Sequence, residues 1–255
     1  MSGPEGWAWV GGAAEGLGAA FATALAQRGH GLLLFDRQAE ALQALARDLG
    51  SRYGLEVHPV PMDLGRPDLA ERLEELVALH PPAIAIYNAA VAPVGDFLGQ
   101  ELGALVEVVD VNVRGPLVWT HVVGNAMARH GGGSIALMSS LAGLQGTPRL
   151  AAYAASKAFS VVLAEGLWAE RKDVHVVCCC AGAIRTPGMV RSTGGREAPG
   201  TLDADEVARQ VLDGLARGPR VVPGPLNRLA ELVVGRLLPR WGAVAVMGRA
   251  TRDLK

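Results

Sequence analysis

Short apolar runs alternate with helical repeats along most of the chain. The apolar runs have the length of buried strands and lie at residues 7–10, 32–35, 55–60, 83–87, 135–138 and 174–180. Between them, leucines recur at the spacing of one helix face, as at Leu42, Leu45 and Leu49. Strands that alternate with helices form a parallel sheet covered on both faces. The pattern therefore predicts an α/β fold, a single-domain doubly wound (Rossmann) sheet over residues 1–255.

Two longer helices and two less regular segments complete the predicted organisation. The helices are expected at about 100–129 and 152–172. Residues 187–200 are rich in Gly, Ser, Thr and Arg, which is typical of a mobile lid. Apolar positions after Pro223 predict a helical extension at about 225–255. We expect this extension to pack on the domain or on a partner subunit; the alternative is a pocket cover, or a weak membrane-surface contact through a basic amphipathic helix.

Glycines cluster directly after the first predicted strand. Gly12, Gly16 and Gly18 follow the spacing Gly-x-x-x-Gly-x-Gly and lead into an alanine-rich helical stretch. A strand, a glycine loop and a helix N-terminus form a phosphate cradle, because backbone N–H groups and the positive helix end face a pyrophosphate that only glycine lets come close. The loop therefore indicates a dinucleotide site, with Glu15 and Leu17 among its residues.

The acid that ends the second predicted strand bears on the choice of dinucleotide. Asp36 follows the glycines at about the 20-residue separation at which an acid accepts the hydroxyls of the adenosine ribose. Asp36 and Glu15 would repel the 2′-phosphate of NADP, whereas the Arg37 guanidinium could bind it. We expect NAD as the preferred cofactor, with NADP possible.

Tyr153 and Lys157 form the most informative pair in the chain. Their spacing places both side chains on one face of a helix. An ammonium beside a phenol stabilises the phenolate and lowers the pKa of the tyrosine, which makes it a proton donor and acceptor near neutrality. The pair therefore indicates general acid–base chemistry.

Taken together, these residues resemble the short-chain dehydrogenase/reductase family over about residues 7–223. Further segments carry the resemblance: Met62-Asp63-Leu64, Asn88-Ala89-Ala90, Val111-Asn112-Val113, Ser140 at thirteen residues before Tyr153, and the run from Gly182 to Thr186. Gly11, Tyr87, Ala90 and Ala181 depart from the residues usual in that family. The resemblance implies a catalytic set of Asn112, Ser140, Tyr153 and Lys157, with no metal. It implies that the cofactor is held by Gly12, Glu15, Gly16, Leu17, Gly18, Asp36, Arg37, Asp63, Leu64, Asn88, Ala89, Ala90, Tyr153, Lys157, Gly182, Ile184 and Thr186.

The implied reaction transfers hydride between a nicotinamide and a secondary alcohol or ketone. Tyr153 would exchange the proton with the substrate oxygen, Ser140 would orient that oxygen, Lys157 would contact the nicotinamide ribose, and Asn112 would hold a relay water. Two alternatives stay open. One is a dinucleotide-binding sensor that has lost its chemistry, and the other is an epimerase or dehydratase that retains its NAD.

The substrate end of the site is less defined by the sequence. The stretches 92–97 and 141–150 are expected to wall a mostly apolar pocket. Arg185, Arg191 and Arg196 could instead bind an anionic substrate, although such arginines are more often solvated.

The net charge and the cysteines bear on the partners and the cellular compartment of the protein. A formal net charge of −1 and a pI near 6.6 give no electrostatic footprint for nucleic acid. The adjacent Cys178, Cys179 and Cys180 suit neither a tetrahedral metal site nor a spaced disulfide framework, and they are expected to be buried in a reducing compartment. We expect a cytoplasmic protein without a membrane span, and the family resemblance implies a homodimer or homotetramer.

Overall fold

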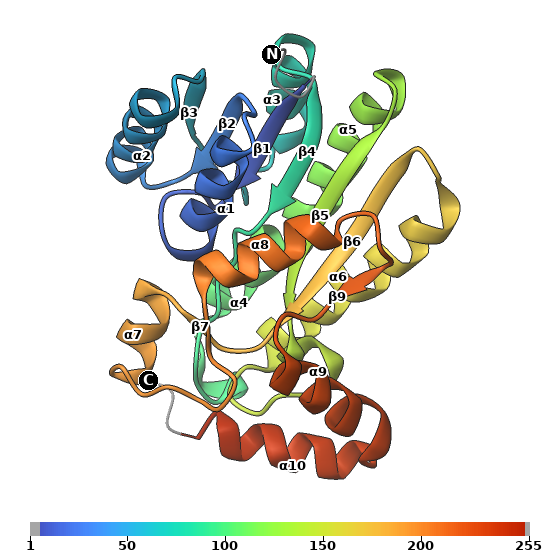
Figure 1. Cartoon of the computed structure of the whole chain (residues 1–255). Coiled ribbons are helices and arrows are strands. Elements are labelled where there is room, and N and C mark those ends of the chain that lie inside the picture. The colour runs from blue at the N-terminus through green and yellow to red at the C-terminus, as the bar shows by residue number, and fades with distance from the viewer. Residues whose placement is uncertain (1–5, 253–255) are drawn as a thin grey trace.

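A sheet of seven parallel strands organises the fold (Figure 1). The computed structural model describes residues 6–252, and within them the strand order is β3-β2-β1-β4-β5-β6-β9. The strands are β1 (Trp7–Gly11), β2 (Leu32–Asp36), β3 (Val57–Pro61), β4 (Pro82–Tyr87), β5 (Gly133–Ser140), β6 (Val174–Ala181) and β9 (Arg220–Val221). The predicted doubly wound α/β fold is confirmed. The edge strand β9 has two residues, too few for a periodic signal, and was not predicted.

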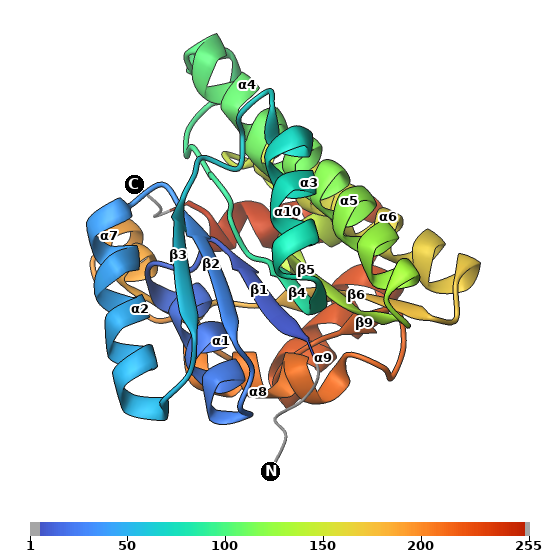
Figure 2. The ribbon, with the colours of Figure 1, turned by 90° about the horizontal axis from the view of Figure 1, so that it is seen from above.

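Helices cover both faces of this sheet (Figure 2). On one face lie α1 (Gly16–Gln27), α2 (Ala39–Tyr53) and α8 (Ala204–Gly214). On the other lie α3 (Leu69–Leu79), α5 (Gly115–Arg129) and α6 (Ala151–Glu170), with α4 (Leu102–Val109) extending beyond them. Both faces are buried, so successive residues of one strand must all be apolar. In β6, Cys179 faces one core, while Cys178 and Cys180 face the other, as buried free thiols.

The predicted helix over about 100–129 is confirmed from Leu102 to Arg129, with one local irregularity. It is divided into α4 and α5 by a π-helical turn at Asp110–Arg114, where the Gly115 N–H donates to the Asp110 carbonyl. Pro116 explains the interruption, because it has no N–H for the carbonyl four residues earlier, that of Asn112.

Tyr87, at the end of β4, holds the π-helical turn against the sheet. Its hydroxyl is buried and donates to the Val111 carbonyl at 2.6 Å. The same ring packs edge-on against Trp119, with ring centroids 5.7 Å apart. A Cβ on Gly115 would come within 2.0 Å of the Tyr87 hydroxyl oxygen, so this close approach requires glycine.

The C-terminal part of the chain lies beyond the carboxyl ends of the strands (Figure 1). It contains β7 (Ile184–Arg185), α7 (Pro187–Thr193), β8 (Leu202–Asp203), α9 (Pro225–Leu232) and α10 (Arg240–Ala250). A second π-helical turn, Val233–Leu237, continues α9. The stretch expected as a lid thus contains a short helix, and the expected C-terminal extension is helical over its described residues.

Gly115→Ala tests the contact between β4 and the π-helical turn. We expect a loss of about 1–3 kcal/mol in the free energy of unfolding, because the new methyl group overlaps the Tyr87 hydroxyl. Chemical denaturation of the purified variant measures this loss. Adding Tyr87→Phe should cost less than the sum of the two single changes.

Gly166→Ala is the matched control, since Gly166 lies within α6 and a Cβ there meets nothing within 4 Å. It should raise stability by up to about 1 kcal/mol. Equal effects at both glycines would contradict the proposed overlap.

Candidate active site

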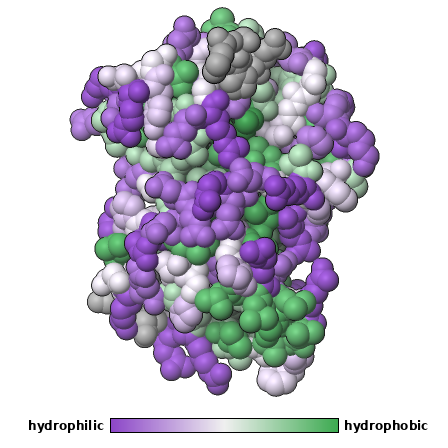
Figure 3. All heavy atoms as spheres, in the orientation of Figure 1, coloured by the Kyte–Doolittle hydropathy of each residue, from purple (hydrophilic) through white to green (hydrophobic). Residues whose placement is uncertain are grey.

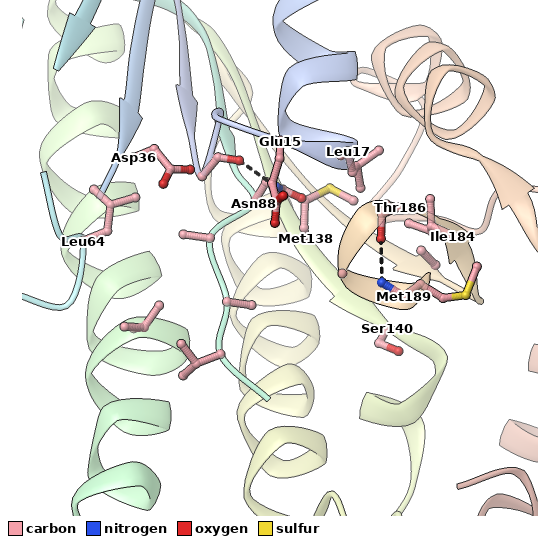
Figure 4. A pocket seen from close by; sticks show the side chains of 18 of the residues that line it. Glu15, Leu17, Asp36, Leu64, Asn88, Met138, Ser140, Ile184, Thr186 and Met189 are labelled. Atoms are coloured by element: carbon pink, nitrogen blue, oxygen red, sulfur yellow. Dashed lines mark hydrogen bonds between the residues drawn. The ribbon is translucent and has the colours of Figure 1, made fainter. Parts of the chain in front are cut away.

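A cleft of about 490 Å³ lies at the carboxyl ends of the central strands. It opens beside β1 and β4, between which the strand order reverses, and such sheets bind ligands at this point. Most of the predicted site residues line it: Gly12, Glu15, Gly16, Leu17, Asp36, Arg37, Asp63, Leu64, Asn88, Ala89, Ala90, Ser140, Tyr153, Lys157, Gly182, Ile184 and Thr186. Figure 4 shows Asp36 and Leu64 at one end of the cleft, and Thr186, Met189 and Ser140 toward the other.

The glycine loop packs closely against the chain that follows β4, an approach that a side chain would prevent. Gly12 has a φ of +76°, and a Cβ there would come within 2.6 Å of the Ala89 amide nitrogen. The Asn88 side-chain amide donates to the Gly12 carbonyl at 3.0 Å and fixes the loop (Figure 4). Gly18 does not line the cleft; a Cβ on it would meet the Gly12 carbonyl oxygen at 1.8 Å. A loop of this form next to the N-terminus of α1 fits the phosphates of a dinucleotide.

Asp36 binds the loop as well as lining the cleft. One carboxylate oxygen accepts from the Ala14 N–H at 3.0 Å, and the other accepts from the Gln38 N–H at 3.0 Å. Each carboxylate oxygen has a further lone pair for a ribose hydroxyl. The carboxylate therefore makes a local turn contact with Gln38 and also lines the cleft.

Two further charged groups near the cleft, Arg37 and Glu15, form ion pairs. Arg37 donates to Glu107 of α4 at 3.0 Å, and Arg191 of α7 donates to Glu15 of the glycine loop at 2.6 Å. The second pair joins the expected lid to the loop across the cleft. Both pairs are partly exposed, so each contributes modestly to stability.

Tyr153, Lys157 and Ser140 meet at the cleft through the packing of α6 on β5. The buried Lys157 ammonium donates to the Met138 carbonyl at 2.7 Å, and the Ser139 hydroxyl donates back to the Lys157 carbonyl at 2.8 Å. The Lys157 nitrogen lies 5.5 Å from the centroid of the Tyr153 ring. These two reciprocal hydrogen bonds lock the helix that carries the phenol to the strand that ends in Ser140.

Ser140 is oriented by the turn that follows it. Its Oγ accepts from the Ala142 N–H at 3.1 Å, at the start of the 3₁₀ turn Leu141–Leu144. That contact uses an oxygen lone pair and leaves the hydroxyl proton available as a donor. The side chain can therefore donate to an oxygen bound in the cleft.

Burial, rather than Lys157, dominates the acidity of Tyr153. Burial raises the pKa of Tyr153, and the hydrogen bond from Ser140 opposes that rise only in part. The expectation that Lys157 lowers the pKa of this phenol is not met. Burial also lowers the pKa of Lys157 itself, from 10.5 to about 8, because the charged form is poorly solvated there.

Asn112 is the one predicted catalytic residue that does not line the cleft. Its side-chain oxygen accepts from the Val91 N–H at 2.9 Å, and its amide nitrogen donates to the Val91 carbonyl at 2.8 Å and to the Ser156 hydroxyl at 3.1 Å. The amide thus holds the backbone of a cleft residue. The π-helical turn places it there, and the expected role of Asn112 in holding a relay water stays a prediction.

Several lining residues were not predicted. They are neighbours of predicted ones in the chain or in the sheet: Gln38, Met62, Val91, Val111, Met138, Ser139, Ala181, Pro187, Gly188 and Met189. The position of Ser139 beside Ser140 at the end of one strand could have indicated it. Met189 enters through α7, where its N–H donates to the Thr186 hydroxyl at 3.2 Å (Figure 4).

The two expected substrate walls lie just past this cleft. Val91 and Ser140 line the cleft, but none of the described residues of 92–97 and 141–150, which follow them in the chain, lines it. The two stretches contact each other, since the Gly95 N–H donates to the Arg149 carbonyl at 2.9 Å. The two stretches therefore extend the site past Ser140 and do not form a wall of the cleft itself.

Comparison with known proteins identifies relatives across most of the chain. A family model described as short chain dehydrogenase matches residues 6–196. A 7beta-hydroxysteroid dehydrogenase from Clostridium sardiniense is 30% identical over 248 residues, covering 95% of this chain and 94% of that protein. A very-long-chain 3-oxoacyl-CoA reductase from Neurospora crassa is 38% identical over 181 residues, covering 67% of this chain but only 54% of that longer protein.

Solved structures share the fold. A short-chain dehydrogenase from Sphingobium yanoikuyae, in complex with NADPH, superposes with a TM-score of 0.80 at 27% identity, covering 91% of this chain and 94% of that one. The structure of a 7beta-hydroxysteroid dehydrogenase superposes with a TM-score of 0.88 at 23% identity, covering 95% and 96%. At that identity, the second likeness concerns the fold alone.

The buried ammonium predicts a pH dependence of stability that Lys157→Met should remove. The folded-state pKa, about 8, lies below the unfolded value of 10.5, so between them the unfolded chain binds more protons. Stability from this group therefore rises as pH increases from about 8 to 10.5, by on the order of 3 kcal/mol. Denaturation of both proteins at a series of pH values measures the difference.

Lys172→Met, which removes an exposed ammonium, is the control and should parallel the wild type across that range. Parallel curves for wild type and Lys157→Met would show that the buried group does not titrate there.

Proposed function

This chain belongs to the short-chain dehydrogenase/reductase family, and from its cleft we propose that it is an NAD(P)-dependent oxidoreductase acting on a mostly apolar secondary alcohol or ketone. The observation that carries the proposal is the meeting of Tyr153, Lys157 and Ser140 at one end of a cleft with a glycine cradle at the other. A cofactor and a reacting oxygen can therefore share one space.

The cleft residues suit a nicotinamide dinucleotide. The backbone of the glycine loop and the N-terminus of α1 would hold the phosphates, and Asp36 would hold the adenosine ribose. The β4 and β6 ends, at 88–90 and 182–186, would flank the nicotinamide half. When bound, that group supplies or accepts the hydride.

The proton steps belong to the protein. In the reducing direction, the Tyr153 hydroxyl donates its proton to the carbonyl oxygen while the Ser140 hydroxyl donates a hydrogen bond to the same oxygen. The nearby Lys157 ammonium stabilises the phenolate that remains. In the oxidising direction the phenolate takes the proton from the alcohol. Asn112 acts as a positioning residue, through the backbone of Val91.

An anionic substrate is not favoured by the arginines near the cleft. Arg185 is held by Glu197 at 2.6 Å and by Asp203, and Arg191 is held by Glu15. Their charges are already matched by carboxylates. Val91, Val111 and Met189 on the cleft wall support an apolar ketone or alcohol instead.

The two other functions depend on observations that the proposal does not share. A silent sensor would not need the hydrogen-bonded set of Ser140, Tyr153 and Lys157, and an epimerase or dehydratase would retain its NAD through purification without net redox change.

We propose a cytoplasmic homodimer or homotetramer. Exposed apolar side chains on α4, α5 and α6, including Val109, Leu117 and Val162, support such self-association.

Tyr153→Phe tests the proposed acid–base role. We expect kcat to fall by about 10²- to 10⁴-fold with cofactor affinity nearly unchanged, because only the transferred proton is lost. A panel of ketones and secondary alcohols, followed by the absorbance of NADH or NADPH, provides the assay, and fluorescence titration gives cofactor affinity.

Tyr53→Phe, which changes a partly buried tyrosine at the end of α2 that does not line the cleft, is its control and should keep wild-type turnover. Near-native activity in Tyr153→Phe would refute the assignment.

Cofactor choice is tested by Glu107→Gln. We propose that NAD is preferred and NADP accepted, since Glu107 engages Arg37 beside the ribose end. Without that carboxylate, the guanidinium is free for a 2′-phosphate, and the ratio of kcat/KM for NADPH over NADH should rise about three- to tenfold. Glu170→Gln, at the end of α6, removes a distant charge and should leave the ratio unchanged. A fall in the ratio for Glu107→Gln would contradict this role of the ion pair.

A further inference from the structure

The C-terminal helices expose a surface of unusual composition. Over residues 225–252, the exposed residues are Pro225, Leu226, Arg228, Leu229, Leu232, Gly235, Arg236, Leu237, Pro239, Arg240, Trp241, Ala245, Val246, Arg249, Ala250 and Arg252. All are apolar, glycine or arginine. A helix face that meets water is ordinarily rich in polar and charged residues of both signs. We call the exposed residues of 225–252 the C-terminal face.

Large apolar side chains on this face are open to solvent. Leu226 is 59% exposed, Leu229 56%, Leu237 67% and Trp241 78%. Figure 3 shows a hydrophobic patch at lower right, where α9 lies in the same view of Figure 1. Contiguous apolar surface of this kind marks an interaction site.

The charge of the C-terminal face has one sign. Residues 225–252 contain five arginines and one glutamate, whereas the whole chain has a formal net charge of −1. Glu231 is only partly exposed and accepts from Arg220 at 3.2 Å, so it does not offset the arginines. A partner must therefore offer both apolar matter and negative charge.

We propose that the C-terminal face binds the surface of an anionic phospholipid bilayer. Leucines and a tryptophan enter the boundary between headgroups and acyl chains, while arginines contact the phosphates. A second copy of the chain is a poorer partner, because a two-fold contact would set the same arginines against one another. Among residues 6–252, no helix has the length and apolarity to cross a bilayer.

The C-terminal face is attached to the substrate side of the cleft. Arg240 donates to the Leu144 carbonyl at 3.1 Å, and Arg149 donates to the Thr251 and Arg252 carbonyls at 3.0 and 2.6 Å. Both contacts lie in 141–150, the stretch that begins next to Ser140. Arg149 has a φ of +65°, which a non-glycine residue adopts only under constraint from its surroundings.

This position would place the reacting end of the cleft near the bilayer. If the proposed function holds, an apolar ketone or alcohol dissolved in the membrane is the substrate that this arrangement serves. That consequence rests on the proposed function, whereas bilayer binding does not.

The test is co-sedimentation of the full chain with vesicles. We expect binding to vesicles of phosphatidylcholine mixed with phosphatidylglycerol, much weaker binding to phosphatidylcholine alone, and release by added salt. Changing Arg228, Arg236 and Arg249 together to Gln should weaken binding to the acidic vesicles on the order of a hundredfold. Changing Leu226, Leu229 and Trp241 together to Ser should abolish it.

The control variant changes Arg47, Arg129 and Arg209 to Gln, which removes three exposed charges from α2, α5 and α8. It should bind as the wild type does. Thermal unfolding and size-exclusion chromatography of each variant show whether it is folded and whether its oligomeric state has changed.

Three outcomes would overturn the proposal: no sedimentation of the wild type with acidic vesicles, equal loss in the control variant, or a change of oligomeric state in the C-terminal variants without any vesicle binding. The last outcome would assign the C-terminal face to a second copy. Since none of these measurements requires turnover, they remain informative if no oxidoreductase activity is found.

Discussion

The site depends on one buried ammonium. Lys157 donates to the Met138 carbonyl, and Ser139 donates back to the Lys157 carbonyl, so helix α6 and strand β5 are held in one register. Gly143 permits the close approach of the turn after Ser140, because a Cβ there would lie 2.8 Å from the Lys157 carbonyl carbon. Burying the ammonium is unfavourable, as its lowered pKa shows. This unfavourable burial occurs at the place where the Tyr153 phenol and the Ser140 hydroxyl must meet.

Many of the site residues could be predicted from the sequence because their positions depend on local patterns. Strand ends and a helix face are fixed by apolar periodicity, and the strands of a parallel sheet deliver their carboxyl ends to one edge. The glycine loop and the pair of Tyr153 and Lys157 therefore followed from spacing, and Ser140 followed from the family resemblance. The partners of the charged residues did not, because Glu15 with Arg191 and Arg37 with Glu107 are distant in sequence and paired only by the fold. The acidity of Tyr153 also escaped prediction, since burial cannot be derived from a four-residue spacing.

The π-helical turn shows where local sequence rules stop short. Helical periodicity continues from 102 through 129, yet Pro116 removes one N–H and the turn widens around Asn112. Tyr87 and Gly115 stabilise the irregular turn by a hydrogen bond and a close contact. Departures of this kind are concentrated near functional sites, where the rest of the structure supports them. Here the gain is a side-chain amide that bridges both backbone groups of Val91, on the cleft wall.

The two ends of the cleft differ in how charge is arranged. At the glycine loop, every carboxylate discussed above faces a guanidinium or a backbone N–H, so the polar end is balanced within the protein. At the far end, the C-terminal helices carry arginines with a single, already engaged carboxylate among them. The protein does not balance the positive charge of these arginines, so the charge is available to an external partner. The exposed leucines beside them indicate that this partner also has an apolar part. This difference follows from the fold. The proposed cofactor site lies among loops at the centre of the sheet. The substrate side is covered by the C-terminal helices α9 and α10, which lie at the periphery and can also contact the proposed bilayer.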